Sequence, residues 1–178
     1  MRISYKQAVG LSVLVFLNSA SAVDNGLANS VVQHKLSLAT ALQAADVCVT
    51  ACRKQKIDVS AAVVDSSGLL QVLLRDTNAS PISATLSQSK AFTAANFLKD
   101  TTQLADLSDT AVGRSAGVLM SAGGVLIKVD GVVYGAIGVS GAATGAKDDE
   151  CARAGFTAIS ESLAKPVAEK SKEPEGTK

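Results

Sequence analysis

Apolar residues recur at helical spacing in two stretches of the chain, and residues typical of a helix start predict another helix between them. The first predicted helix has Ser37 as its N-cap and ends near Lys54. A second helix has Ser80 as N-cap and Pro81 in its first turn, and continues to about Asn96. The buried stripe of the first helix is expected to consist of Leu38, Leu42, Ala45, Val49 and Cys52. A final helix, expected to end near Lys165, carries a narrow stripe of Ala152, Phe156, Ile159 and Leu163.

Short apolar runs separated by turn residues predict strands. Ala61–Val64 and Leu69–Leu74 flank Asp65-Ser66-Ser67-Gly68, and the pair is expected to form a β-hairpin. Asp130-Gly131 separates two further runs and is a strong signal for a two-residue hairpin turn. The strand-like runs of this second half are Gly117–Met120, Val125–Val129 and Val132–Val139.

The order of these elements indicates the fold class. Between the second helix and the last strands, Thr101–Ser108 is expected to form a short helical turn and Thr110–Ser115 a loop. Two hairpins joined by helices cannot form an all-parallel sheet. The sequence therefore predicts an α/β (α+β) fold, with an antiparallel sheet of about five strands flanked by helices.

The first 22 residues have the pattern of a secretory signal peptide. Arg2 and Lys6 precede the apolar run Ala8–Leu17, and Ala20-Ser21-Ala22 forms an A-x-A cleavage site. As a helix this run would span roughly 15 Å, about half a hydrocarbon core, which argues against a stable membrane anchor. We therefore expect a periplasmic or secreted protein whose mature chain begins at Val23.

The mature chain is long enough for one domain. Its 156 residues carry 15 basic and 16 acidic side chains, a balance that implies no nucleic-acid partner. Residues 23–35 are expected to lead into a domain over residues 36–164. The segment Lys165–Lys178 is rich in charge and almost free of apolar residues, and is expected to be a disordered tail.

Three cysteines leave at least one thiol unpaired within a monomer. Cys48 and Cys52 are four positions apart on a predicted helix, where Cβ atoms lie about 5–6 Å apart, whereas a disulfide needs roughly 3.8 Å. A disulfide would therefore join Cys151 to one of them, and three small buried thiols fit the sequence equally well. A zinc site is disfavoured, because the single histidine is not at ligand spacing from any cysteine.

Several motifs occur together in a characteristic order and spacing. They are Leu36-Ser37-Leu38, Ala62-Val63-Val64-Asp65 with Gly68, Ser89–Ala94, and Gly135–Gly141 followed by Asp149-Glu150-Cys151-Ala152. From about Leu36 to Leu163 the chain resembles the GlcG/HbpS-like haem-binding family. The resemblance implies a profilin-like fold, assembly into dimers or larger oligomers, and haem or a related tetrapyrrole as the bound group.

Two departures from the family pattern affect the expected ligand side. This chain has Ala122-Gly123-Gly124 where members commonly carry Pro-Gly-Gly, and the preceding segment is shortened around Val112–Val118. Only 3% of the residues are aromatic and none is tryptophan, so a haem cleft would rely on aliphatic walls.

Two side chains are candidate ligands of the haem iron. His34 is the only imidazole, and its place at the start of the domain resembles the iron-ligating position of some relatives. The alternative for His34 is a solvated residue ahead of the first helix. Met120 offers a thioether sulfur, with core filling as its alternative role.

Other candidate residues would contact the ligand without binding iron. Lys90 and Arg75 are suited to carboxylate or propionate groups. A solvated helix face is the alternative for Lys90, and a surface ion pair within Arg75-Asp76 is the alternative for Arg75. Gly123 and Gly124 belong to the ligand-side turn of the family pattern.

Other chemistries have less support. Gly135–Gly141 lies in a strand without a G-x-G start, so its glycines are expected to allow a close backbone approach at a subunit contact or a bend before the last helix, not nucleotide binding. Asp148, Asp149 and Glu150 suit a helix N-terminus better than a metal. A serine nucleophile has no visible base partner, so no catalytic residue is assigned.

The leading hypothesis is therefore an exported, oligomeric haem-binding protein with His34 as the first axial candidate and the porphyrin in an apolar cleft near a subunit contact. It rests mainly on the family resemblance. Two alternatives stay open. One is a small-molecule or haem-modifying enzyme that uses Lys90 and Arg75 with an exogenous cofactor, and the other is an oligomeric interaction module without a ligand.

Overall fold

Most of the helices and strands that the sequence predicts are present in the structure. The computed structural model describes residues 32–164, so the expected signal peptide and the expected charged tail lie outside the described residues. The elements are α1 (Leu38–Lys54), β1 (Ser60–Asp65), β2 (Leu70–Arg75), α2 (Pro81–Phe97), the 3₁₀ helix η1 (Thr101–Leu107), β3 (Gly124–Val129), β4 (Val132–Ser140) and α3 (Gly145–Ala164).

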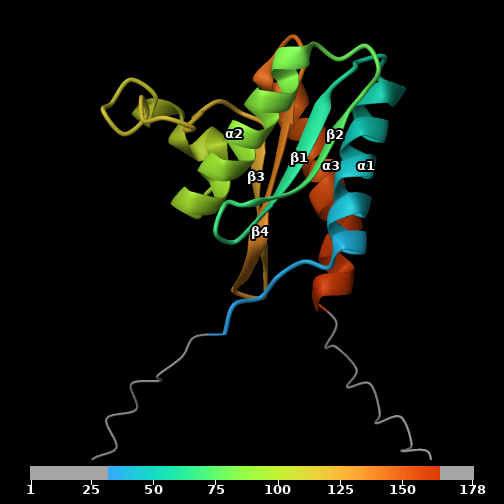
Figure 1. The fold of residues 1–178 in the computed structure, drawn as a ribbon, viewed down its shortest axis with the longest axis vertical. Helices are drawn as coiled ribbons and strands as arrows, with labels where there is room; N and C mark the ends of the chain where they lie inside the picture. The colour runs from blue at the N-terminus through green and yellow to red at the C-terminus, as the bar shows by residue number, and fades with distance from the viewer. Residues whose placement is uncertain (1–31, 165–178) are drawn as a thin grey trace, which may run out of the picture. The chain divides into compact units, whose positions relative to one another are not determined.

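The strands form one antiparallel sheet in the order β2-β1-β4-β3 (Figure 1). Two hairpins, β1–β2 and β3–β4, are joined where β1 pairs with β4. Asp130 and Gly131 have φ angles of 49° and 83°, the positive values that a two-residue hairpin turn requires. The predicted fold class is confirmed, with four strands in this sheet in place of about five.

The fifth predicted strand, Gly117–Met120, is part of a loop. Gly117 has a φ of 81°, and the Val118 amide donates to the Ser115 carbonyl in a turn. The Leu119 amide donates to Thr93 Oγ1 of α2 at 2.8 Å. The backbone amides of Val118 and Leu119 therefore donate hydrogen bonds within a turn and to a side chain, and not to a neighbouring strand.

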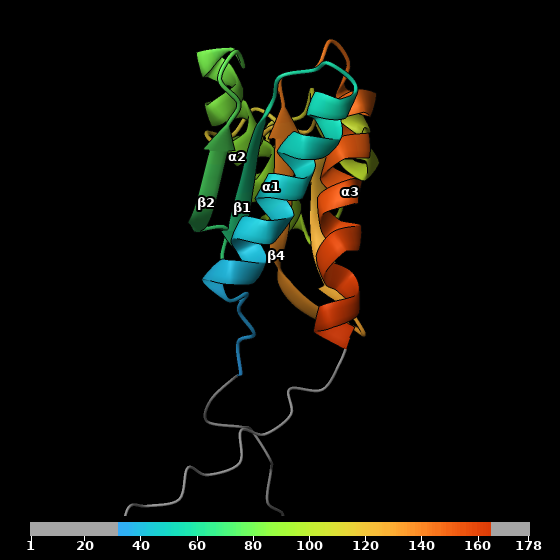
Figure 2. The same cartoon turned by 90° about the vertical axis from the view of Figure 1, so that its right-hand side faces the viewer.

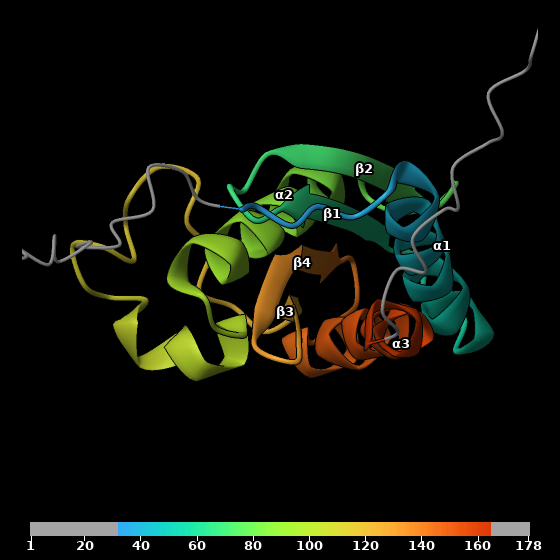
Figure 3. The same cartoon turned by 90° about the horizontal axis from the view of Figure 1, so that it is seen from below.

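Helices cover both faces of the sheet. Figures 2 and 3 show α1 and α3 on one face and α2 on the other. The face under α1 and α3 holds the larger core, which includes the fully buried Val63, Ile127, Ile137 and Ile159. The face under α2 is built from smaller side chains, namely Ala62, Val64, Ala91, Ala94, Ala95 and Ala136.

Two glycines let α2 lie directly on the backbone of β3 and β4. A Cβ atom at Gly138 would collide with the Ser87 carbonyl and lie 2.5 Å from the Ala91 nitrogen. A Cβ atom at Gly124 would lie 2.6 Å from the Lys90 carbonyl oxygen. The close approach expected at a subunit contact thus occurs within the chain.

The buried stripe of α1 differs from the prediction at its start. Ser37 caps the helix as predicted, since its Oγ accepts a hydrogen bond from the Thr40 amide at 3.1 Å. Leu38 and Leu42, however, are 66% and 47% exposed. The buried residues are Ala41, Ala44, Ala45, Cys48, Val49 and Cys52.

A disulfide joins the two helices of the larger core. Cys52 of α1 and Cys151 of α3 are bonded, with their Cα atoms 5.6 Å apart. Cys48 is buried as a free thiol, and desolvation raises its pKa to about 12. The disulfide includes Cys151, as the sequence required of any bridge.

Within residues 32–164, no helix is long and apolar enough to cross a membrane.

Candidate functional site

The segment that carries His34 is fixed against the β1–β2 turn. Gln33 Nε2 donates to the hydroxyls of Ser66 and Ser67, at 2.8 and 2.9 Å. Leu36 is buried, and its carbonyl accepts a hydrogen bond from Gln71 Nε2 at 3.0 Å. His34 therefore lies between two anchored neighbours and leads into the capped start of α1.

The imidazole of His34 is exposed and contacts one aromatic ring. Its ring centroid lies 5.8 Å from that of Tyr134, with an edge-on angle of 67° between the planes. Tyr134 belongs to β4 and packs on the α1/α3 side of the sheet. Among the described residues, neither nitrogen of His34 has a hydrogen-bond partner. Both nitrogens are therefore open to a metal or a ligand.

Apolar side chains are exposed at this end of the sheet. Val32 is 85% exposed, two positions before His34. Leu69 and Leu70, which follow the Ser66-Ser67 turn, are 67% and 42% exposed. An exposed imidazole at the same end of the sheet as exposed aliphatic side chains is compatible with a porphyrin, whose iron takes a nitrogen ligand and whose flat ring is apolar.

Lys90 takes part in a buried ion pair. It lies on α2 and is 3% exposed, so the alternative of a solvated helix face is wrong. Its Nζ donates to Asp148 Oδ2 at 2.7 Å and to the Val139 carbonyl at 3.0 Å. The ammonium is therefore held by α3 and β4 within the chain.

Asp148 belongs to the same buried cluster and not to a simple helix cap. Its Oδ1 accepts a hydrogen bond from the Ala142 amide at 3.0 Å, in the bend between β4 and α3. Desolvation raises the pKa of this carboxyl, against the lowering effect of Lys90. Gly123 packs on the pair, since a Cβ atom there would lie 3.0 Å from Lys90 Nζ and 2.7 Å from Asp148 Cβ.

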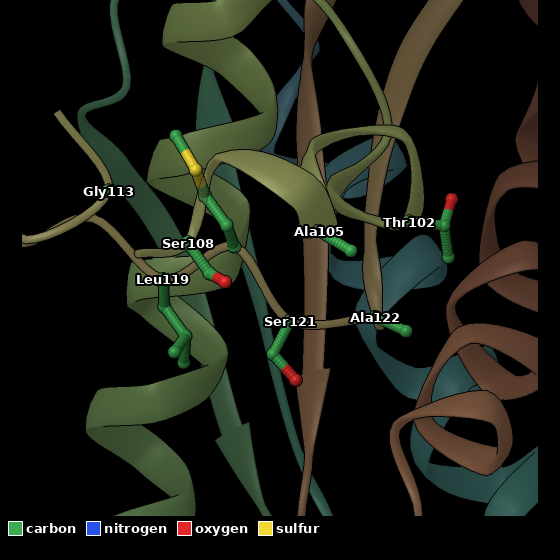
Figure 4. A pocket seen from close by; sticks show the side chains of 8 residues that line it. Thr102, Ala105, Ser108, Gly113, Leu119, Ser121 and Ala122 are labelled. Carbon is green, nitrogen blue, oxygen red and sulfur yellow. The ribbon is translucent and has the colours of Figure 1, made fainter. Parts of the chain in front are cut away.

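Met120 lines a cavity of about 550 Å³ between η1 and the loop that precedes β3 (Figure 4). The residue is 5% exposed. Leu119 and Ala105 add apolar surface, and Thr102 and Ser121 add hydroxyls. The lining residues carry no charged side chain, and the volume lies within the usual range of about 300–1,000 Å³ for small-molecule sites.

Arg75 does not form the ion pair considered for Arg75-Asp76. Its Nη1 donates to the Ala79 carbonyl. Asp76 instead pairs with Arg53, whose Nε and Nη2 donate to the two carboxylate oxygens at 2.9 and 3.0 Å. These hydrogen bonds hold the pKa of Asp76 below its ordinary value of 3.8.

The candidate residues fall at two ends of the sheet. His34 lies beside Tyr134, near the start of β4, and beside the turn that precedes β2. Lys90, Gly123 and Gly124 meet near the end of β4, where the Val139 amide donates to the Gly123 carbonyl. Arg75 is at this second end too, because both it and Ser140 pair with Ser60 of β1. The structure therefore does not bring His34 together with these residues.

Two residues beside the candidates were missed from the sequence. Tyr134, the ring beside His34, is the single tyrosine after the expected cleavage site, and this rarity was a usable signal. The sequence around Asp148 indicates only a helix start, because its partner Lys90 is 58 residues away and the pairing has no local signature.

Comparison with known proteins connects this chain to haem. A family model described as "Haem degrading protein HbpS-like" matches residues 36–157. The protein GlcG of Escherichia coli strain K12 is 40% identical over 93 residues, which are 49% of this chain and 68% of GlcG.

Solved structures show the same fold. A crystal structure of HbpS has a TM-score of 0.70 and 35% identity, and the match covers 74% of this chain and 94% of that one. A crystal structure of a PduOC:heme complex has a TM-score of 0.65 and 25% identity, and the match covers 70% of this chain and 95% of that one.

Proposed function

Because this chain belongs to the HbpS-like family, whose description names haem, we propose that it binds haem with His34 as an axial ligand of the iron. The observation that carries the proposal is the state of that imidazole. It is exposed, it lies on an anchored segment, and neither nitrogen has a hydrogen-bond partner among the described residues. Imidazole nitrogen is a common axial ligand of haem iron.

The surroundings of His34 support a porphyrin over a bare metal ion. Val32, Leu69 and Leu70 supply exposed aliphatic surface, and Tyr134 supplies one aromatic ring. Lys35 lies next to His34 with its side chain 59% exposed. Its ammonium is 3.8 Å from Asp65 Oδ2, and a propionate group would compete with this partly exposed ion pair. The bound haem would supply the iron chemistry, while these residues hold and orient the macrocycle.

Export is the second part of the proposal. Its support is the predicted leader together with the Cys52–Cys151 disulfide, because structural disulfides form and persist in oxidising compartments. We also infer assembly into oligomers, as the family resemblance implies. An enzyme that uses Lys90 for its ligand has less support, since Asp148 already binds that ammonium.

A haem titration tests the proposal. The full chain is expressed with its own leader, purified and titrated with hemin while the Soret band is recorded. Wild type should give a saturable band at one haem per chain. His34→Ala should shift or weaken that band and lower the affinity by about tenfold or more, about 1.4 kcal/mol per factor of ten.

Two control variants make the result specific. Gln33→Ala removes an anchor of the same segment but keeps the imidazole, and should retain the Soret position. Met120→Leu tests the thioether and should leave the band unchanged. A wild-type band that His34→Ala does not alter would remove His34 as the ligand, and the absence of a saturable band in wild type would contradict haem binding. Loss of the Soret band over time with ascorbate and oxygen would instead indicate haem degradation.

A further inference from the structure

Two β-bulges lie at the end of the sheet that carries His34. In β4, the residues on either side of Tyr134 pair with consecutive residues of β3, so Tyr134 is an extra residue without a partner there. In β2, the residues on either side of Gln71 pair with consecutive residues of β1, so Gln71 is extra in the same sense. Gln71 follows the residue that pairs with Val64, and Tyr134 precedes the residue that pairs with Asp65. Both bulges are therefore beside the end of β1, and bulges are common where a side chain must be re-aimed at a functional site.

Each bulge reverses the face of the sheet on which its side chain lies. Side chains alternate between the faces of a regular strand, and Ile137 lies in the larger core under α1 and α3. Counted back from Ile137, regular alternation would place Tyr134 on the α2 face, yet Tyr134 packs against the larger core. Val72 also belongs to the larger core, so alternation would place Gln71 on the α2 face. Gln71 Nε2 instead reaches the carbonyl of the core residue Leu36. The bulges thus turn both side chains towards the segment that precedes α1.

These two side chains hold that segment at different points. Gln71 holds its backbone, with Nε2 3.0 Å from the Leu36 carbonyl oxygen. Tyr134 holds its imidazole, with 5.8 Å between the ring centroids of Tyr134 and His34 and an edge-on angle of 67°. Edge-on aromatic pairs attract each other beyond the area that they bury. The orientation of the exposed imidazole is therefore set by the sheet and not by the preceding segment alone.

We propose that Tyr134 is a positioning residue for His34, with the β4 bulge as the feature that brings its ring to the imidazole. This inference deepens the proposed function and rests on it: His34 ligates the iron, and Tyr134 fixes the plane of the imidazole beforehand. An exposed imidazole without such a contact samples several rotamers, and that freedom is lost on ligation. A ring held in one orientation reduces this cost and favours a single axial geometry.

The ring contact can be tested without haem. The full chain, expressed with its own leader and without an affinity tag, contains one histidine, so NMR spectra show one set of imidazole C–H signals. Wild type should give NOEs from these protons to the Tyr134 ring, and a ring current should displace the signals from the positions of free histidine. Tyr134→Phe keeps the ring and should keep both features. Tyr134→Leu should move the signals to the free-histidine positions, and unchanged signals in this variant would overturn the contact.

The same variants are then titrated with hemin. Tyr134→Leu should bind haem about two- to tenfold more weakly than Tyr134→Phe, the range expected from one aromatic pair. The EPR signal of its ferric complex should broaden or split, because several imidazole orientations are populated, whereas a loss of stability alone would not change that line shape. Equal affinity and an unchanged EPR signal in Tyr134→Leu would overturn the positioning role. Loss of binding in Tyr134→Phe would assign the phenol as a ligand and overturn it too.

A second variant tests the other bulge and does not depend on the folding of Tyr134→Leu. Gln71→Met removes the donor to the Leu36 carbonyl but keeps both rings, and it should weaken the NOEs between His34 and Tyr134. NOEs of wild-type strength would show that the Gln71 contact does not hold the segment.

His34→Ala separates the positioning role from the proposed function. Haem binding that depends on His34 but not on Tyr134 removes only the positioning role and leaves His34 as the ligand. Haem binding that is independent of His34 removes the axial ligand, and Tyr134 then has no ligation to position.

Discussion

The ion pair of Lys90 and Asp148 links three elements at one end of the sheet. Both residues are 3% exposed, and their hydrogen bonds reach β4 and the bend before α3. A buried pair of this kind contributes little beyond its desolvation cost, whereas removal of one partner leaves a buried charge. The pair therefore fixes the position of α2 relative to α3, and it adds little to the free energy of unfolding.

Lys90→Met is expected to lower the free energy of unfolding by about 3–5 kcal/mol at neutral pH, because the Asp148 carboxylate stays buried without its partner. Burial already raises the pKa of Asp148, so the folded state holds that proton more tightly than the unfolded state. This contribution to stability is present below the ordinary value of 3.8 and is lost as pH rises through the folded pKa. The variant should therefore be relatively more stable in acid, as urea unfolding at a series of pH values would show.

Two further variants separate the buried charge from lost packing. Lys90→Met with Asp148→Leu should regain part of the lost stability, because no unpaired charge remains. Lys147→Met breaks an exposed pair with Glu150 and should cost at most about 1 kcal/mol. If the double variant were no more stable than Lys90→Met alone, the unpaired charge of Asp148 would not be the cause of the loss.

At the scale of the elements, local signals were sufficient wherever a turn or a cap is made by neighbouring residues. The Asp130-Gly131 hairpin and the Ser37 cap formed as predicted for that reason. Leu38 and Leu42 were misassigned because helical spacing identifies an apolar face but not what covers it. Gly117–Met120 was misassigned because its partner, the Thr93 hydroxyl, is distant in the sequence.

The packing of α2 on the sheet depends on Gly138. Gly138→Ala is expected to cost about 1–3 kcal/mol of unfolding free energy, because the added methyl collides with the Ser87 carbonyl and α2 must move outward. Urea denaturation measures the loss. Gly131→Asn is the control: no atom lies within 4 Å of a Cβ there, and asparagine tolerates the φ of 83°. Equal stability of Gly138→Ala and wild type would show that α2 does not rest on β4 as described.

At the scale of the whole molecule, the sequence left open three free thiols or a disulfide from Cys151 to either Cys48 or Cys52, and the packing of α1 on α3 selects Cys52. Cys52 faces Cys151, while Cys48 lies one turn earlier and contacts the next turn of α3 near Gly155. The site was less predictable. A family likeness indicated which residues to consider, but only the three-dimensional structure shows that His34 and Lys90 lie at opposite ends of β4.

Thiol counting tests the pairing. The folded, unreduced protein should show no thiol reactive to Ellman's reagent, because Cys48 is buried and its pKa is raised to about 12. Denaturation without reductant should expose one thiol, and denaturation with prior reduction should expose three. Three thiols in the unreduced, denatured sample would show that the disulfide does not form.

The disulfide also determines what a single proteolytic cut does to the protein. Cys52 and Cys151 are 99 residues apart, so their bond closes a covalent ring that contains the whole sheet, α2 and the largely exposed stretch 108–117. A single protease cut in that stretch opens the ring without separating the pieces. The nicked molecule keeps its mass until it is reduced, when it divides into an amino-terminal and a carboxyl-terminal fragment. Damage within this exposed stretch therefore leaves the two halves of the molecule joined for as long as the disulfide is intact.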